Sequence, residues 1–427
     1  MKRLRKEVEV FLRCPRSMRI LIVSNMIYAL VLPVIEIFVA AYVMRNSHAV
    51  SRVVTYQLAV YAATPVAFYL NGILLGRVEV KHLYAAGMLL SGVAMVLLMR
   101  SGVLTPQGIA TYGLAMGLAT GLFWANRGFL ALATTNDDNR NYYYGVELFV
   151  AALAAVAVPA LIGWFISGAS LYGWLGGTAD RAYRMIALAV LGLTVLSAIL
   201  LERGSFRNPG RTHFVFFRFH ALWRRMLALA LLKGLAQGYM LTAPAMLIML
   251  LVGQEGTLGM TQAIGGVFSA CLLYTVGRIT APHHRMIVFA CGLLLFLLGA
   301  VSNALFFNAV GVLIFIGCLV LAKPLLDLAY NPIEFQVVDV VSRKEGRNEY
   351  AYLFNHEIGL FTGRCLGCAL FLAIAHWWSG VAALKYALPV VALLQLFSIW
   401  VAGQISRSLE VEDRTPLPGF SGPAPEF

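Results

Sequence analysis

The residues of this sequence that could do chemistry are ionisable side chains inside long apolar runs. Glu36 lies in the first such run, and Arg127, Glu147 and Glu334 lie in later ones. If these runs cross a membrane, each charged group costs about 2.5 to 3.5 kcal/mol to insert and must face a partner or a watery cavity. The sequence therefore predicts binding or proton exchange at membrane depth.

Glu36 is the candidate for proton coupling. It stands three residues after Pro33, whose ring frees a backbone carbonyl and can bend a helix. A lone carboxyl group lining a cavity at this depth can take up and release a proton during a cycle. The alternative is that Glu36 lies near the outer surface and is simply hydrated.

Three charge pairs are candidates for ion pairs or gates. Arg127 and Glu147 stand at comparable depths in adjoining runs, which favours a pair between them. Lys323 and Asp327 are four residues apart, a spacing at which side chains on one helical face neutralise each other. Alternatively, Arg127 meets Glu334 across a central space and forms a gate that breaks when two halves of the protein separate.

A polar cavity wall is predicted from Lys233 and Gln237, which lie one helical turn apart, with Tyr28, Arg127 and Tyr239 as further cavity candidates. Arg127 and Lys233 are the candidates for holding an anionic group of a solute. In another run, His356, Glu357 and Arg364 are expected to pack against a neighbouring helix, and a role in proton movement is the alternative.

Several other chemistries are not expected. Cys365 and Cys368 have a redox or metal spacing but stand beside glycines inside an apolar run, which favours small packing residues. His356-Glu357 begins like a zinc-protease helix, but Leu360 occupies the position of the second histidine. Phosphate-loop, dinucleotide and nucleophile-elbow patterns are absent from the sequence. We expect no enzyme activity, no cofactor and no metal site.

The composition explains where these residues must lie. Of the 427 residues, 60% are hydrophobic and only 12% are charged, whereas soluble chains carry about 25% charged residues. This composition excludes a water-soluble domain. Because charged side chains are too few to cover the surface, most of the surface must face lipid. The net charge of +13 does not indicate nucleic acid, because the basic residues stand in short segments between the apolar runs.

The sequence predicts an all-α membrane protein with about twelve spanning helices, since each span needs roughly 20 apolar residues. An even number places both termini on one side. About 23 Lys and Arg residues fall on that side and about 6 on the other, which predicts cytoplasmic termini and an inner-membrane location. The predicted spans are residues 20–44, 53–76, 82–99, 109–133, 143–167, 183–201, 225–252, 258–277, 285–307, 310–338, 351–375 and 380–405.

A long basic connection divides the chain into two halves. We expect a first bundle at 1–201, a linker at 202–224, a second bundle at 225–409 and a disordered tail at 410–427. Residues 214–225, rich in aromatic and basic residues, could lie in the membrane interface or form a hydrated linker.

The two halves resemble copies of each other. Three pairs of signals recur at offsets of 211, 201 and 207 residues, which predicts a duplication with like orientation. The last offset places Arg127 opposite Glu334. The pairs are Tyr28 and Pro33 with Tyr239 and Pro244, Gly76-Arg77 with Gly277-Arg278, and Arg140-Asn141 with Arg347-Asn348.

The segment after the second span resembles a signature of the major facilitator superfamily, G-x-x-x-D-R-x-G-R-R/K. GILLGRVEVK matches it at Gly72, Arg77 and Lys81, but Gly76 replaces the aspartate and Glu79 replaces the second glycine. In that superfamily the Asp and Arg help to hold the cytoplasmic side closed, and Gly76 has no carboxylate for that lock. The Arg-Gly pair of the superfamily's fourth span is similar to Arg127-Gly128.

Glycines at spacing four form two stripes. Small residues every fourth position let helices approach closely in lipid. The resemblance implies that spans two and eleven face each other. We therefore expect the glycines of these two spans, Gly72 and Gly76 in span two and the stripe of span eleven, to form a surface on which the halves slide, with static packing as the alternative. The stripes are Gly113, Gly117 and Gly121, and Gly359, Gly363 and Gly367.

The resemblance implies a secondary transporter in which two six-helix bundles alternately expose a central site. We expect a monomeric carrier of a small organic, amphipathic solute, working by proton-coupled export. Uptake of a small anionic metabolite is one alternative, and a lipid flippase or membrane-embedded enzyme using residues 214–225 is another. Partners are therefore the solute, protons and the lipid bilayer, and no nucleic acid.

Overall fold

The computed structural model describes residues 9–101, 104–135, 137–173, 178–206, 208, 216, 218–253, 255–279, 284–347 and 349–413. Within these ranges, twelve helical segments are long and apolar enough to cross a membrane, as predicted. The chain is thus a multi-pass membrane protein. The side on which the first span begins and the last one ends is called the terminus side below, and the opposite side is called the far side.

The first six spans consist of α2 (Arg16–Ala29), η1 (Val34–Phe38) and α3 (Val39–Ser47) together, then α4 (Val50–Leu74), α5 (Val80–Arg100), α6 (Pro106–Thr134), α7 (Asp137–Leu171) and α8 (Ala179–Glu202). The second six consist of α9 (Ala221–Met240) and α10 (Ala243–Leu251) together, then α11 (Glu255–Ile279), α12 (Arg285–Phe306), α13 (Ala309–Glu345), α14 (Glu349–Trp377) and α15 (Gly380–Asp413).

Prolines interrupt the first and seventh spans at matching places. The α2 helix ends just before Pro33, and α9 ends four residues before Pro244. Proline has no N–H for the helical ladder, so the regular hydrogen bonding stops near it. After Pro33 the chain forms a wide π turn that contains Glu36. This shared break agrees with the predicted duplication.

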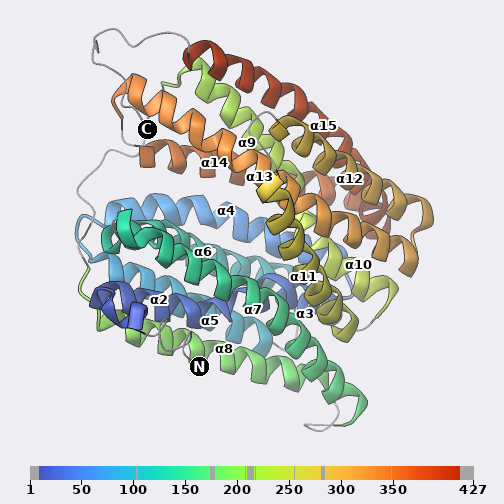
Figure 1. Cartoon of the computed structure of the whole chain (residues 1–427). Coiled ribbons are helices and arrows are strands. Elements are labelled where there is room, and N and C mark those ends of the chain that lie inside the picture. Colours follow the sequence, from blue (N-terminus) through green and yellow to red (C-terminus); the bar gives the residue numbers. More distant parts are fainter. Residues whose placement is uncertain are drawn as a thin grey trace, which may run out of the picture.

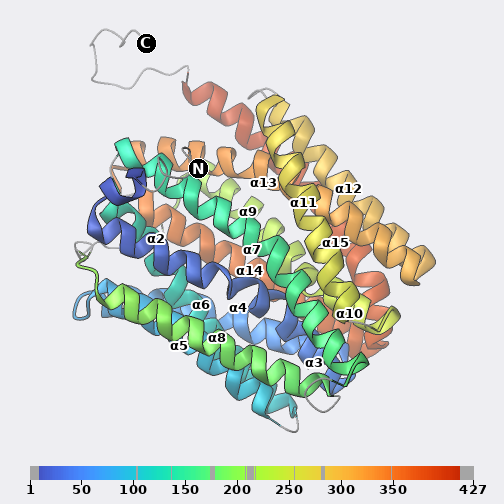
Figure 2. The ribbon, with the colours of Figure 1, turned by 60° about the horizontal axis from the view of Figure 1, so that its bottom comes forward.

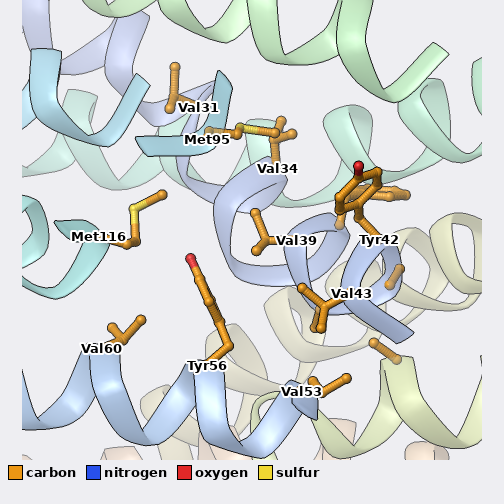
Figure 3. Packing of buried hydrophobic residues seen from close by; sticks show 14 of the residues in the cluster. Val31, Val34, Val39, Tyr42, Val43, Val53, Tyr56, Val60, Met95 and Met116 are labelled. Atoms are coloured by element: carbon orange, nitrogen blue, oxygen red, sulfur yellow. The ribbon is translucent and has the colours of Figure 1, made fainter. Parts of the chain in front are cut away.

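One face of the π turn packs into the first bundle. Val34 and Val39 are buried with Val31, and Met95 of α5 and Met116 of α6 lie in the same cluster (Figure 3). Glu36, by contrast, is exposed. The turn therefore anchors its apolar side chains inside the bundle and presents its carboxyl group away from the bundle core.

The spans form two six-helix bundles that meet along two seams (Figures 1 and 2). In Figure 1 the first bundle lies below the second. Helix α4 packs against α14 in one seam, and α7 packs against α11 in the other. Within the bundles, α4 packs on α6, and α9 packs on α14.

Both glycine stripes lie inside their own bundles, so the stripe of span eleven does not form the predicted sliding surface and serves static packing instead. A Cβ on Gly117 would lie 2.3 Å from the carbonyl oxygen of Val60 in α4, and one on Gly363 would lie 2.1 Å from that of Leu231 in α9. The glycines thus bring helices of one bundle into backbone contact. The seam between α4 and α14 contains aromatic pairs instead, among them Tyr61–Phe361, with ring centroids 6.0 Å apart.

The central connection is shorter than predicted, because α9 already begins at Ala221. Trp223 is fully buried and packs edge-on against Tyr352, and Phe216 packs against the same ring. Most of residues 209–217 lie outside the described residues. At the other end, α15 continues to Asp413, four residues into the segment expected to be disordered, and 414–427 lie outside the description.

Candidate functional site

Arg127 and Glu147 form the ion pair that the sequence favoured. The Arg127 Nη2 atom lies 2.9 Å from Glu147 Oε2, and its Nε donates to Oε1 at 3.0 Å. Asn25 of α2 also donates to Glu147 Oε1, at 2.9 Å. Two close approaches of one guanidinium and a further amide donor compensate the charge of a buried carboxylate. Both charges are therefore neutralised inside the first bundle.

Glu334 binds a partner in its own bundle, so the predicted gate between Arg127 and Glu334 is absent from this conformation. Its Oε1 lies 3.2 Å from Nδ1 of His356 in α14. The other ring nitrogen, Nε2, lies 2.6 Å from the hydroxyl of Tyr330. The physical reason is reach, because each of the two charges finds a partner on an adjoining helix of its own bundle.

The four-residue spacing predicted an ion pair between Lys323 and Asp327, but Asp327 binds a different lysine. The Oδ1 atom of Asp327 lies 3.2 Å from the Nζ atom of Lys233 in α9. The same Nζ atom lies 3.8 Å from the ring centroid of Tyr330. A desolvated ammonium group over an aromatic face gains a cation–π attraction in addition to the ion pair. Asp327 and Tyr330 of α13 thus hold the Lys233 side chain, whereas the Lys323 side chain is exposed.

Three accessible charged groups gather between the bundles. Lys323 and Arg364 lie within electrostatic range of Glu36, although these three form no ion pair with one another in the described part of the chain. Arg364 is held by Gln237, whose Oε1 accepts from Nε at 3.1 Å and from Nη2 at 2.8 Å. Its guanidinium also lies 5.3 Å from the ring of Tyr61, which belongs to the other bundle.

These groups combine high accessibility with positions inside spans. Glu36 and Lys323 are exposed, and Arg364 is half-buried. Charged groups at this depth are stable only where water or a polar solute reaches them. Because Glu36, Lys323 and Arg364 come from η1, α13 and α14, and both cations act on Glu36, we expect the three groups to border an accessible space between the two bundles.

The predicted tyrosines do not both contribute to this space. Tyr28 is buried within the first bundle, where its hydroxyl lies 3.0 Å from that of Ser91 and its ring centroid lies 4.3 Å from that of Phe123. A hydrogen-bonded tyrosine inside a bundle serves packing, so Tyr28 does not line the accessible space. The side chain of Tyr239 lies outside the described residues.

The loop motif after α4 is held by its own half of the protein. Arg77 is exposed, and Gly72 lies in the last turns of α4. Lys81 lies 3.2 Å from Glu79 and 4.0 Å from Glu202 at the end of α8.

Asn208 of the central connection completes this arrangement. Its Oδ1 accepts from the backbone N of Val80 at 2.8 Å, which caps the start of α5, and its Nδ2 donates to Val78 O at 3.1 Å. The loop is therefore tied to the central connection.

The far side of the molecule is closed by contacts that the sequence did not reveal. Arg45 at the end of α3 lies 2.6 Å from Glu255 at the start of α11, with side chains 35% and 5% exposed. Next to this pair, a Cβ on Gly259 of α11 would lie 2.2 Å from the carbonyl oxygen of Pro159 in α7. The partners are far apart in sequence, and no local spacing could have identified them.

Comparisons with known proteins agree with this architecture. No family model matches the chain. The uncharacterized protein YqgE of Bacillus subtilis is 22% identical over 353 residues, which cover 82% of this chain and 80% of that protein.

Three solved structures are similar over almost their whole length. A POT family transporter in complex with a thioalcohol-conjugated peptide has a TM-score of 0.67 at 12% identity, covering 92% of this chain and 97% of the other. A bacterial homolog of the human lysosomal transporter Spinster, inward-facing and unoccupied, has 0.66 at 10%, covering 94% and 99%. A point mutant of the nucleoside transporter NupG has 0.60 at 10%, covering 93% and 100%. With its twelve spans and two bundles, the chain has the fold of the major facilitator superfamily.

Proposed function

We propose that this protein is a secondary active transporter that moves a small organic solute across the membrane by alternating access. The fold supports this function, since the three similar structures are transporters. The observation that carries the proposal is the accessible charged group of Glu36, Lys323 and Arg364 between the bundles. Charged groups at membrane depth are costly unless water or a bound solute solvates them.

The surroundings of this group favour an amphipathic solute. The guanidinium of Arg364 lies 4.5 Å from the ring centroid of Phe361 and 5.3 Å from that of Tyr61. Aromatic faces beside charged groups bind a solute that has both an apolar body and a polar end. The proposed solute therefore places its charged end near Arg364 and its apolar part against these rings.

The far-side contacts provide the two-state element that alternating access requires. In this conformation the Arg45–Glu255 pair and the backbone contact at Gly259 hold the bundles together on the far side. Opening to that side must break both, while the rigid bundles rock about the seams. The Lys and Arg bias of the sequence supports a cytoplasmic terminus side, so we infer that these far-side contacts close the outer face of the protein.

We propose proton-coupled export as the mode of transport. Uptake of an anionic metabolite is the second candidate, because neither Lys323 nor Arg364 has a carboxylate within ion-pair distance among the described residues. A flippase finds less support. The aromatic rings of Phe216 and Phe219 in the central connection pack on each other, and Phe216 also packs on Tyr352.

Flux into proteoliposomes with an imposed pH gradient tests the proposal, with a panel of amphipathic cations and small organic anions as probes. We expect proton-driven export of at least one amphipathic compound and loss of that flux in Glu36→Gln and Arg364→Gln. Glu410→Gln, which alters an exposed carboxyl group at the end of α15, is the matched control. Anion accumulation would favour the second candidate. Unchanged flux in both site variants would refute the assignment of the site.

A further inference from the structure

A buried acid–imidazole pair lies in the second bundle, beside the accessible space. Glu334 and His356 are only 8% and 3% exposed, and their Oε1 and Nδ1 atoms are 3.2 Å apart. The second ring nitrogen of His356 is engaged by the buried hydroxyl of Tyr330 at 2.6 Å. Both ends of the imidazole are thus fixed by hydrogen-bonding groups.

This arrangement stores one exchangeable proton. With the proton present, the pair is neutral in total, either as carboxylate and imidazolium or as carboxylic acid and imidazole. When the proton leaves, the pair carries a net negative charge in a buried site. An uncompensated buried charge is costly, so proton loss requires a nearby cation to respond.

Lys233 is the cation in position to respond. It lies within electrostatic range of both Glu334 and His356 and stands over the ring of Tyr330. In this structure its ammonium group binds Asp327, whose side chain is 38% exposed. Lys233 therefore lies between the buried pair and an accessible carboxylate, and both compete for it.

A route for the proton is also present. Glu357 approaches His356 Nδ1 with its Oε1 at 3.9 Å, and its side chain is 39% exposed. Arg364, on the same helix, is a second cation within electrostatic range of His356. A proton leaving Nδ1 can pass to the Glu357 carboxylate and from there to water. The buried pair then keeps the negative charge.

We propose that the Glu334–His356 pair binds the coupling proton and that Lys233 transmits its loss to Asp327 at the solute space. This rests on the proposed transport function. Proton loss draws Lys233 toward the buried pair and weakens its hold on Asp327, so the charge presented to the solute changes with the protonation state. The buried pair, in place of Glu36, then binds the coupling proton, and Glu36 contacts the solute.

The test measures proton binding directly and needs no knowledge of the solute. Purified full-length protein in lipid nanodiscs is titrated between about pH 5 and pH 8, with proton release followed by an indicator dye and histidine protonation by NMR of ¹³C-labelled histidine. We expect Glu334→Gln and His356→Gln each to release about one proton fewer than the wild type. The His356 signal, assigned by its absence in His356→Gln, should lose its titration in Glu334→Gln.

Two further variants separate the parts of the proposal. Glu36→Gln should keep the full proton release. Lys233→Gln should still show the His356 signal but lose the pH-dependent change in distance between spin labels on the two bundles. Size-exclusion chromatography of each variant controls for folding.

Retention of wild-type proton release in Glu334→Gln, or its loss in Glu36→Gln, would overturn the assignment. An unchanged spin-label response in Lys233→Gln would overturn the role of the lysine. These results do not depend on flux. A protein that titrates as expected but moves none of the tested solutes would contradict only the proposed transport function.

Discussion

The far-side seam gives the sharpest prediction, because Gly259 leaves no room for a side chain. In Gly259→Ala the new Cβ would stand 2.2 Å from the carbonyl oxygen of Pro159 and 3.0 Å from the Cα of Gly163. Ordinary contact begins at 3.4 Å, so α11 and α7 must separate by 1.2 Å at this point, the difference between 3.4 and 2.2 Å. The obstacle is backbone, which cannot rotate away as a side chain can.

The forced separation of α7 and α11 raises the free energy of the conformation in which the far side is closed. Overpacking of this kind costs about 1 to 3 kcal/mol. If the open conformation relieves the clash, the equilibrium shifts toward it by roughly 5- to 150-fold. We therefore expect Gly259→Ala to populate a far-side-open state that the wild type rarely visits.

Pulsed electron spin resonance measures this shift. Spin labels at the exposed positions Leu171 of α7 and Leu250 of α10 report the distance across the far side in nanodiscs. Gly317→Ala is the matched control, because a Cβ there meets nothing within 4 Å. A folded Gly259→Ala protein whose distance distribution equals that of the wild type would show that this contact does not hold the far side closed.

Four further predictions concern individual contacts. Neutralising Arg45 or Glu255 should shift the same spin-label distances, and a double-mutant cycle should give a coupling of about 1 to 2 kcal/mol, since Arg45 is partly exposed. Glu147→Ala should destabilise the first bundle by about 1 to 3 kcal/mol in thermal unfolding, because it leaves a partly buried guanidinium unpaired, with Glu147→Gln milder. Gly363→Ala should lower the melting temperature through a backbone clash with α9, unlike an alanine at an open glycine. Asn208→Ala should cost about 1 kcal/mol of stability by removing the cap of α5, and an unchanged melting temperature would argue against that role.

Much of the fold follows from the sequence, because lipid imposes a simple requirement. Each span must be apolar over the full hydrocarbon thickness, so hydropathy reveals the number and order of helices. The breaks after α2 and after α9 were also foreseeable, since Pro33 and Pro244 cannot continue the hydrogen-bond ladder. The Arg127–Glu147 pair was predictable for a related reason, because two charges at equal depth in adjoining spans have few other ways to be neutralised.

The partners of the other charges depended on how each helix is rotated and which neighbour it meets. Asp327 lies four residues from Lys323, yet it binds Lys233, because α9 brings that ammonium group over Tyr330. A charged side chain in a helix can bind a partner on the same helix or on the neighbouring helix. The hydropathy of the span is the same in both cases, so it does not distinguish them. For this reason the sequence supplied the charged groups and their approximate depth, whereas the Glu334–His356 pair and the Arg45–Glu255 contact emerged only when helices distant in the chain were packed together.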